Sequence, residues 1–283
     1  MRTQAALVLT IVALTLGGCS TEPSTLEEVM ADVSAKAAKI ETYATDFVAV
    51  AKMGGMEMTY TGDMMGKGNL MAATMNMNMM GQSIVTKMIL DASNTMWMDM
   101  DMMGMKQVMK MDMAQVEKFQ EDALGELLPG GLGGLGGMGS MQNDPRFMLE
   151  QMANTFDLTY EGKERFNDSD VYVLHGTLRP DIKAQLEGTA DGDNPFAIGM
   201  SMAGSMMGSM RLKIGTKDGF VRLNEMLDES GAPWMTMTYE NVRINGQIDG
   251  SDFEYTPPSD AVVMDLSDMM EQMNMTELEG DLP

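Results

Sequence analysis

The sequence predicts an α+β protein that is mostly β and is built around an antiparallel meander. Apolar and polar residues alternate in many short segments, and a period of two is typical of strands because successive side chains point to opposite faces of a sheet. Glycine, asparagine and serine separate these segments at nearly regular intervals, as turns between antiparallel strands do. Segments with a helical period precede and interrupt the strands.

The clearest alternation runs from Met96 to Met113. Methionine recurs at every second position over most of this stretch, and the positions between hold mainly tryptophan, aspartate and lysine. The pattern predicts a β-hairpin with one thioether face and one charged face. Just over half of the chain's 39 methionines lie between Met53 and Met113. Methionine is a weak strand former, but its flexible, polarisable side chain suits a surface that fits varied apolar partners.

The remaining elements follow from the positions of turns and of helical periods. A helix is predicted for residues 26–41, where Ser24 and Thr25 offer capping boxes with Glu27 and Glu28. Further helices are predicted for residues 113–128 and 144–155. Strands are predicted for residues 45–53, 56–65, 70–80, 84–91, 157–166, 171–178, 210–215, 220–228 and 233–244, and residues 252–258 close the domain.

We therefore expect one folded domain over residues 26–263. A glycine-rich loop, residues 129–144, interrupts it and lacks the Gly-Lys-Ser/Thr ending of a phosphate-binding loop. Residues 179–205 form a polar connection rich in glycine. Residues 264–283 form an acidic, methionine-containing tail whose apolar residues have a helical spacing, which predicts a loosely docked helix.

The first 18 residues are predicted to be a lipoprotein signal peptide, followed by a lipidated tether at residues 19–25. Arg2 supplies the positive start, and the apolar run of residues 5–16 is too short to span a membrane. The run ends in Leu16-Gly17-Gly18-Cys19, which resembles the bacterial lipobox. The resemblance implies cleavage before Cys19, a diacylglyceryl group on its sulfur and an acyl chain such as palmitate on its amine. Several chains together anchor a protein stably.

Residue 20 bears on where the anchored protein is sorted. By resemblance to the sorting signals of enteric bacteria, Ser20 in place of an aspartate favours the outer membrane. We therefore expect a lipid-anchored protein of the bacterial cell envelope, at the outer membrane and facing the periplasm. Cys19 is the only cysteine, so the mature chain has no disulfide and its stability must come from its core.

Composition and missing motifs exclude several classes of function. A formal charge of -23, from 42 acidic and 19 basic residues, argues against nucleic acid as a partner, since phosphate binding needs clustered lysine and arginine. We expect no enzyme and no cofactor, because the chain lacks a Gly-x-Ser-x-Gly elbow, a Cys–His pair and a histidine-rich motif. His175, the single histidine, is interpreted as a partnered core or rim residue. Asp191–Asn194 lacks the spacing of an EF-hand, so no metal site is assigned.

The order of elements in the C-terminal half resembles a known family. Residues 171–176, 210–219 and 227–242 form strands and turns, and the series ends in the pattern Phe-x-Tyr-x-Pro-Pro from Phe253 to Pro258. This order resembles the C-terminal half of the LolA/LolB-like lipoprotein-carrier superfamily, which includes the mycobacterial LppX-type lipoproteins. The N-terminal helix and the methionine-rich meander match that superfamily more by architecture than by motif.

The resemblance implies a half-open, curved antiparallel sheet, an incomplete barrel, with helices covering its concave face. It also implies an apolar cavity that takes acyl chains, and carrier members of the superfamily pass lipids or lipoproteins between membranes. The chain departs from its relatives in its methionine content and in the Gly130–Gly139 insertion. With its flanking helices, that insertion would form a lid over the mouth of the cavity.

The methionine faces have three interpretations that the sequence leaves open. They fill a core, they line a lipid cavity, or they bind copper, since thioethers are soft ligands that select Cu(I). The predicted function is binding of a lipid or of the acyl chains of a lipoprotein, for transport or sorting. A periplasmic copper-binding lipoprotein and a non-transporting structural envelope protein are the alternatives. The residues predicted to line the cavity are Met75, Met77, Met79, Met96, Met98, Met100, Met109, Met111, Met235 and Met237.

Overall fold

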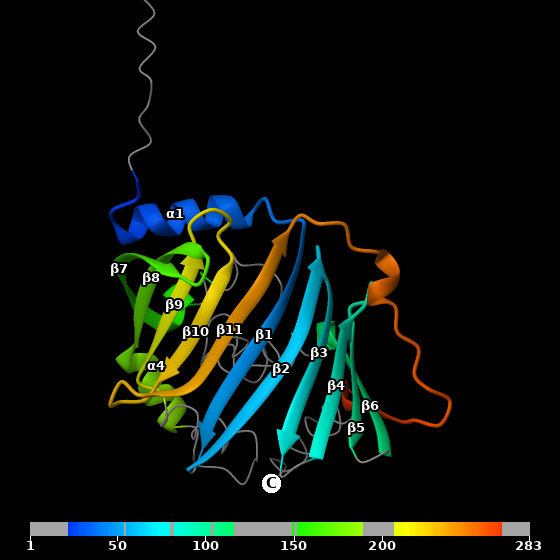
Figure 1. Ribbon diagram of the computed structural model, residues 1–283. Helices are drawn as coiled ribbons and strands as arrows, with labels where there is room; N and C mark the ends of the chain where they lie inside the picture. The colour runs from blue at the N-terminus through cyan, green and yellow to red at the C-terminus, as the bar shows by residue number, and fades with distance from the viewer. Residues whose placement is uncertain are drawn as a thin grey trace, which may run out of the picture.

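The computed structural model describes residues 22–53, 55–79, 82–102, 105–115, 149, 152–188 and 207–267. Within them lies a 12-stranded sheet with the order β12-β6-β5-β4-β3-β2-β1-β11-β10-β9-β8-β7 (Figure 1). The elements are α1 (Leu26–Ala37), β1 (Thr42–Met53), β2 (Met56–Lys67), β3 (Leu70–Met79), β4 (Gln82–Leu90), β5 (Thr95–Met102), β6 (Met105–Asp112), β7 (Phe156–Phe166), β8 (Ser169–Leu178), α4 (Pro180–Gly188), β9 (Ser209–Gly215), β10 (Val221–Leu227), β11 (Pro233–Ile244), the 3-10 helix η2 (Gly250–Phe253) and β12 (Val262–Asp265).

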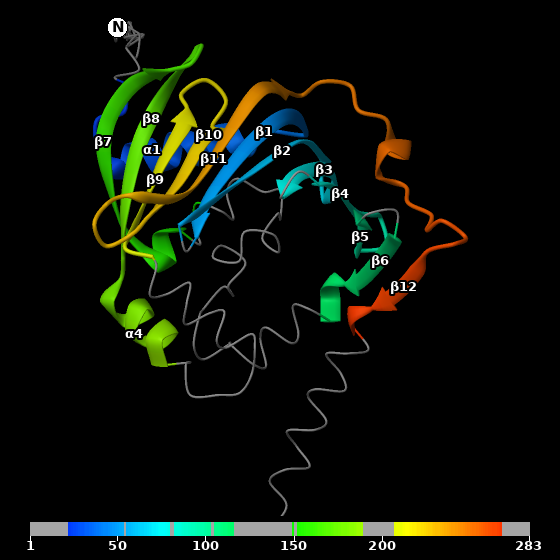
Figure 2. The ribbon, with the colours of Figure 1, turned by 60° about the horizontal axis from the view of Figure 1, so that its bottom comes forward.

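The sheet consists of two meanders joined at β1. Strands β1 to β6 pair in chain order, and so do β7 to β11. β11 then pairs along β1, so the two meanders form one continuous surface. Figure 2 shows that this surface bends into an arc whose edge strands, β7 and β12, do not meet. The predicted fold class, a mostly β protein with a half-open curved sheet, is confirmed.

Helix α1 begins at the predicted capping box and ends earlier than predicted. The Glu28 N–H donates to Thr25 Oγ1 at 3.3 Å, and the Thr25 N–H donates back to Glu28 Oε2 at 3.2 Å. The helix stops at Ala37 instead of residue 41 because Asn245 takes over the next backbone groups. Its Oδ1 accepts from the Glu41 N–H at 2.8 Å, and its Nδ2 donates to the Lys39 carbonyl at 2.9 Å.

On its concave face, β2 carries a glycine, Gly62, at a position that has no room for a side chain. A Cβ at Gly62 would lie 1.9 Å from the Thr74 carbonyl oxygen of β3 and 2.8 Å from the ring of Phe47 on β1. Phe47 is itself buried, with 3% of its surface exposed. The absence of a side chain at Gly62 therefore lets the Phe47 ring of β1 lie across β2.

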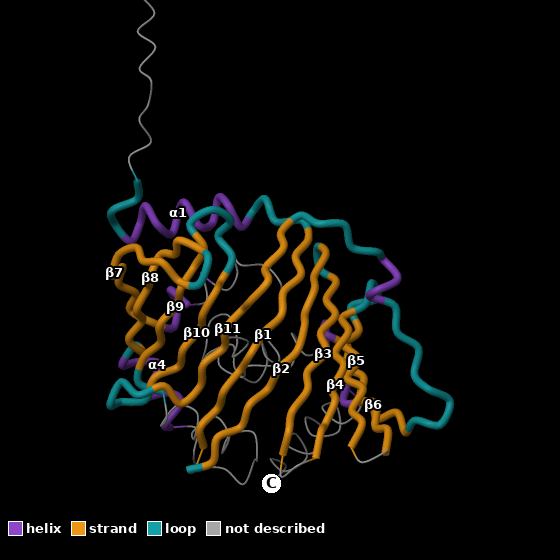
Figure 3. Tube along the Cα trace, viewed as in Figure 1, coloured by secondary structure: helices purple, strands orange, loops and turns teal. Residues whose placement is uncertain are grey.

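The end of the described chain departs from the prediction. Residues 245–261, here called the strap, leave β11 and cross the outer side of the sheet, where the Lys67 ammonium donates to the Ile248 carbonyl at 3.2 Å. Figure 3 shows the strap as a path of loops and one short helix that passes β4 to β6. The chain then forms β12, which pairs with β6 in parallel. The helix predicted from Met264 onward is therefore wrong at its start, because Met264 and Asp265 belong to a strand.

Most strand boundaries agree with the prediction to within a few residues, and β11 agrees at both ends. The helix α4 occupies the first part of the predicted connection 179–205. Other expectations lie outside the described residues. They concern the signal peptide, Cys19, most of the predicted helices 113–128 and 144–155, Gly130–Gly139, Asp191–Asn194 and the tail beyond residue 267.

Gly62→Ala should lower the free energy of unfolding by about 1–3 kcal/mol, because the added methyl group meets a backbone oxygen that cannot move without breaking the β2–β3 ladder. Urea unfolding followed by circular dichroism measures this loss. Gly246→Ala is the matched control, since nothing lies within 4 Å of a Cβ at that position. Equal stability of the two variants would contradict the close approach at Gly62.

Candidate functional site

The two faces of the sheet can be told apart at β5. Trp97 and Asp99 point to the strap, because the Trp97 ring lies 5.5 Å from the Tyr255 ring and the Tyr255 hydroxyl donates to Asp99 Oδ2 at 2.9 Å. The strap runs along the outside of the arc (Figure 2). Met96, Met98 and Met100 alternate with these residues and therefore lie on the concave face.

The strand register carries the same face around the sheet, since residues directly opposite one another on neighbouring strands share a face. Met98 lies opposite Met109, and Met96 lies opposite Met111. Thr86 lies opposite both Met75 and Met100.

A single row then links the two meanders. Met77 lies opposite Tyr60, Tyr60 opposite Ala49, and Ala49 opposite Met237. Met235 shares the face of Met237 at the next alternate position.

The predicted methionines therefore come together on the concave face wherever their side chains are described. We call this set the methionine wall: Met75, Met77, Met96, Met98, Met100, Met109, Met111, Met235 and Met237. The side chain of Met79 lies outside the described residues. Met96 is buried, with 7% of its surface exposed, and the others are half-buried. Met96 belongs to a core cluster against which Met98 and Met111 pack.

The sequence prediction did not include three buried methionines of this face. Met64, Met71 and Met88 are 6%, 0% and 1% exposed and belong to the same cluster as Met96. Met71 has the same alternation as Met75, and Met88 lies opposite Met98. The alternation of β3 would have identified Met71, whereas identifying Met88 required the register between β4 and β5.

The other half of the concave face lies against α1. Val29 and Val33 are fully buried in a cluster with Leu174, Leu212 and Ile214 from β8 and β9. Met235 packs against this second cluster. The concave face therefore has a part over β7 to β10 that a helix covers and a part over β1 to β6 that is rich in methionine.

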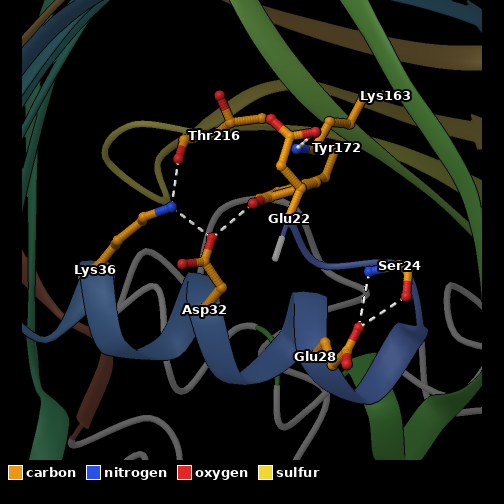
Figure 4. Close-up of polar contacts among 8 residues, drawn as sticks. All are labelled: Glu22, Ser24, Glu28, Asp32, Lys36, Lys163, Tyr172 and Thr216. Carbon is orange, nitrogen blue, oxygen red and sulfur yellow. Dashed lines mark hydrogen bonds and ion pairs between the residues drawn. The ribbon is translucent and has the colours of Figure 1, made fainter. Parts of the chain in front are cut away.

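A polar clamp fixes α1 to the sheet (Figure 4). The Tyr172 hydroxyl donates to Asp32 Oδ2 at 2.7 Å. The Lys36 ammonium donates to the same carboxylate and to the Thr216 carbonyl of the β9–β10 turn. The Lys163 ammonium lies 5.3 Å from the centre of the Tyr172 ring. The clamp joins one turn of α1 to β7, β8 and the β9–β10 turn.

The clamp shifts the titration of its members. Burial acts to raise the pKa of Asp32, but hydrogen bonds from Lys36 and Tyr172 and the charges of Lys36 and Lys163 outweigh it, so the pKa lies below its ordinary value. Burial and the neighbouring Asp32 carboxylate raise the pKa of Tyr172. Asp32 is therefore ionised and Tyr172 neutral at neutral pH.

A second polar cluster lies at β5 on the outer face of the sheet, opposite the methionine wall. Trp97 Nε1 donates to Asp91 Oδ2 at 2.9 Å, and the Ser93 N–H donates to Asp91 Oδ1 at 2.8 Å. Burial acts to raise the pKa of Asp91, but hydrogen bonds from Ser93, Trp97 and Thr95 outweigh it and lower the pKa. Burial and Asp99 raise the pKa of Tyr255. The Asp91 bonds fix the β4–β5 turn and the Trp97 ring, and the Tyr255–Asp99 bond and the Trp97–Tyr255 ring contact hold β5 to the strap.

His175 is half-buried, and among the described residues the Nδ1 atom of its ring lacks the partner that the sequence interpretation expected. It lies opposite Thr159 and Arg211 on the outer face, and its Nδ1 is buried without a hydrogen-bond partner in the described part of the chain.

A pocket of about 510 Å³ lies elsewhere, between Lys52, Trp234 and the β10–β11 turn. None of the predicted methionines lines it. Across the described ranges, no three histidine, cysteine, aspartate or glutamate side chains gather as they would around a metal ion. Nor do those ranges hold a helix long and apolar enough to cross a membrane.

No family model and no curated protein matches this chain. Among solved structures, LppX from Mycobacterium tuberculosis is similar with a TM-score of 0.42 and 9% identity, over 80% of this chain and 100% of that one. LprF from Mycobacterium bovis is similar with a TM-score of 0.41 and 11% identity, over 85% and 100%. MucB, in complex with MucA(peri), is similar with a TM-score of 0.41 and 12% identity, over 80% of this chain and 58% of MucB. The chain thus spans less than two thirds of MucB.

The LppX-type lipoproteins named by the sequence resemblance are therefore among the structural neighbours.

Tyr172→Phe should lower the free energy of unfolding at pH 7 by about 1.5–3 kcal/mol, because it removes a hydrogen bond to a charged group.

The stabilisation from Asp32 should also depend on pH. Because the pKa of Asp32 is lowered by folding, its contribution is present above the unfolded pKa of about 4 and is lost as the pH falls through the folded value.

The measurement is urea unfolding of the natural protein and of Asp32→Asn from about pH 7 to about pH 3. The difference in unfolding free energy should be constant above about pH 5 and should shrink below it. Glu27→Gln removes a carboxylate from the same helix outside the clamp; it is the control and should give a smaller difference at pH 7. A difference between natural protein and Asp32→Asn that does not change with pH would contradict the clamp.

Proposed function

We propose that this protein is anchored to a membrane of the cell envelope through lipidated Cys19 and binds the acyl chains of a lipid or lipoprotein on the methionine wall. The observation that supports the proposal is the shared face. Methionines from β3, β5, β6 and β11, up to 162 residues apart (237 − 75), lie on the concave side of one open sheet.

The composition of the wall suits an acyl chain. Thioether side chains offer apolar area, and removing such area from water contributes about 25 cal/mol per Å². A surface that had only to fill space would gain strand stability from valine or isoleucine. Unbranched methionine side chains repack at low cost, so one wall accommodates chains of different length and saturation.

The position of the tether fits the same role. Glu22 lies three residues after Cys19, and its carboxylate pairs with the Lys163 ammonium of β7 at 3.0 Å. Three extended residues span about 10 Å. A lipid on Cys19 would therefore hold the β7 edge of the sheet close to the bilayer, from which acyl chains would be taken or to which they would be delivered. Transport or sorting of lipid within the envelope is the function we assign.

Met98→Gln with Met100→Gln should weaken binding of a fluorescent fatty acid at least about tenfold, about 1.4 kcal/mol, because two amides without partners replace apolar groups of the wall. Fluorescence titration of the mature chain carrying Cys19→Ser measures the affinity. Met98→Leu with Met100→Leu is the matched control and should bind as the natural sequence does, since leucine keeps the wall apolar at similar volume.

Circular dichroism must show that both double variants are folded. Unchanged affinity in the folded glutamine variant would count against the wall as the binding surface. No binding by the natural sequence would favour a filled sheet with a structural role.

Cys19→Ser should move the protein from the membrane fraction to the soluble fraction of the producing cells, because no acyl chains remain to anchor it. Fractionation followed by immunoblotting measures this, and an alkyne analogue of palmitate should label the natural protein and not the variant. Thr21→Ala, two residues away, should remain labelled and in the membrane fraction. Labelling of Cys19→Ser would sink the assignment of the lipidation site.

A further inference from the structure

Four methionines from four strands lie at one level of the sheet. Met88 of β4 is opposite Met98 of β5, Met98 is opposite Met109 of β6, and Met109 is opposite Met264 of β12. We call Met88, Met98, Met109 and Met264 the methionine row. It depends on the strap, because only the return of the chain to β6 brings Met264 into register.

The row continues from the core toward the edge of the sheet. Met88 is 1% exposed, whereas Met98, Met109 and Met264 are half-buried. Gln107 Nε2 donates to Met264 Sδ at 3.6 Å, so a lone pair of this sulfur points toward β6. The row is thus buried at its β4 end and more accessible to solvent at β5, β6 and β12.

The spacing allows several sulfurs to meet one ion. Neighbouring strands lie about 4.8 Å apart, and residues directly opposite in an antiparallel pair have Cα atoms about 4.5–5.5 Å apart. Each methionine has three rotatable side-chain bonds. Members of the row on neighbouring strands can therefore turn their sulfurs toward a common point above the sheet.

We propose that the methionine row is a binding site for a single monovalent copper ion, held by thioether sulfurs alone. Thioethers are soft ligands that select Cu(I) over Zn²⁺ and Mg²⁺. The only histidine, His175, lies on the outer face of β8 and cannot take part. Methionine sulfur carries no proton at any ordinary pH, so binding of the ion releases none.

The first experiment is a competition titration of Cu(I) against a chromophoric chelator, under nitrogen with ascorbate, using the mature chain with Cys19→Ser. We expect one Cu(I) per chain and an affinity that does not change between pH 6 and pH 8. This range spans the ordinary pKa of histidine, about 6.5, so a histidine ligand would make the affinity depend on pH. X-ray absorption should show sulfur as the only type of ligand. Nitrogen or oxygen ligands, or no competition with the chelator, would overturn the proposal.

The second experiment replaces the sulfurs without changing the apolar character. Met98→Leu, Met109→Leu and Met264→Leu together should weaken Cu(I) binding at least about a hundredfold, since leucine offers no ligand. The matched control is Met75→Leu with Met77→Leu and Met237→Leu, on the same face. The residues opposite these three are Gly62, Thr86, Tyr60, Ile84, Ala49 and Asn224, none of which is methionine.

The control should keep the copper affinity of the natural sequence. Equal loss in both triple variants, or equal retention in both, would overturn the row as the site. The leucine variants also separate this proposal from acyl binding. If the Met98, Met109 and Met264 variant keeps fatty-acid binding and loses copper, both proposals are supported. If it loses fatty-acid binding and keeps copper, the copper row is overturned, and acyl binding on the wall requires methionine and not merely an apolar side chain.

Discussion

The pairing of β1 with β11 is the constraint on which the whole sheet depends. It joins the two meanders, and a slip by one residue would turn every side chain of one meander to the other face. A bulge inside this pair keeps the faces aligned. The concave residues of β11 are Met235, Met237 and Tyr239 before it, and Val242 and Ile244 after it, so the parity changes at Asn241. Asn241 has a φ of 51°, its Nδ2 donates to Asp46 Oδ2 at 2.6 Å, and the Thr45 hydroxyl donates to the Glu240 carbonyl at 2.7 Å. These bonds hold the register in place.

Two polar clusters fix the segments that are not held by hydrogen bonds between strands. Asp32 with Tyr172 fixes α1 against one meander, and Asp99 with Tyr255 fixes the strap behind the other. In both, a tyrosine hydroxyl donates to a half-buried carboxylate, and bonds of this kind to a charged acceptor are stronger than neutral ones. Polar contacts thus fix α1 on one part of the sheet and the strap on its outer side. The concave face of β1 to β6 is formed largely by methionine side chains, which repack easily.

The sequence predicted the faces of the strands better than the register between them. Alternation alone placed Met96, Met98 and Met100 on one side, because that property is local to β5. The predicted meander and hairpin indicated which strands pair, but not that Met98 lies opposite Met88 and Met109, since that depends on the register. β12 was missed because Val262–Asp265 is only four residues long and becomes a strand through its contact with β6, which lies 155 residues away in sequence at Met109 and Met264 (264 − 109). The end of α1 likewise depended on Asn245, a distant residue.

An unclosed sheet leaves two edges, and each edge of this one is unsuited to adding a strand from another chain. β7 carries alternating charges at Glu161, Lys163, Glu164 and Arg165, and its register shifts at Gly162, where φ is 123°. β12 offers only four residues, and its last, Asp265, is held by Lys110 at 2.6 Å. Charges, a bulge and shortness are the devices by which proteins prevent edge-to-edge aggregation. The parallel strand at the end of the strap therefore also acts as a stop that limits self-association of an open barrel.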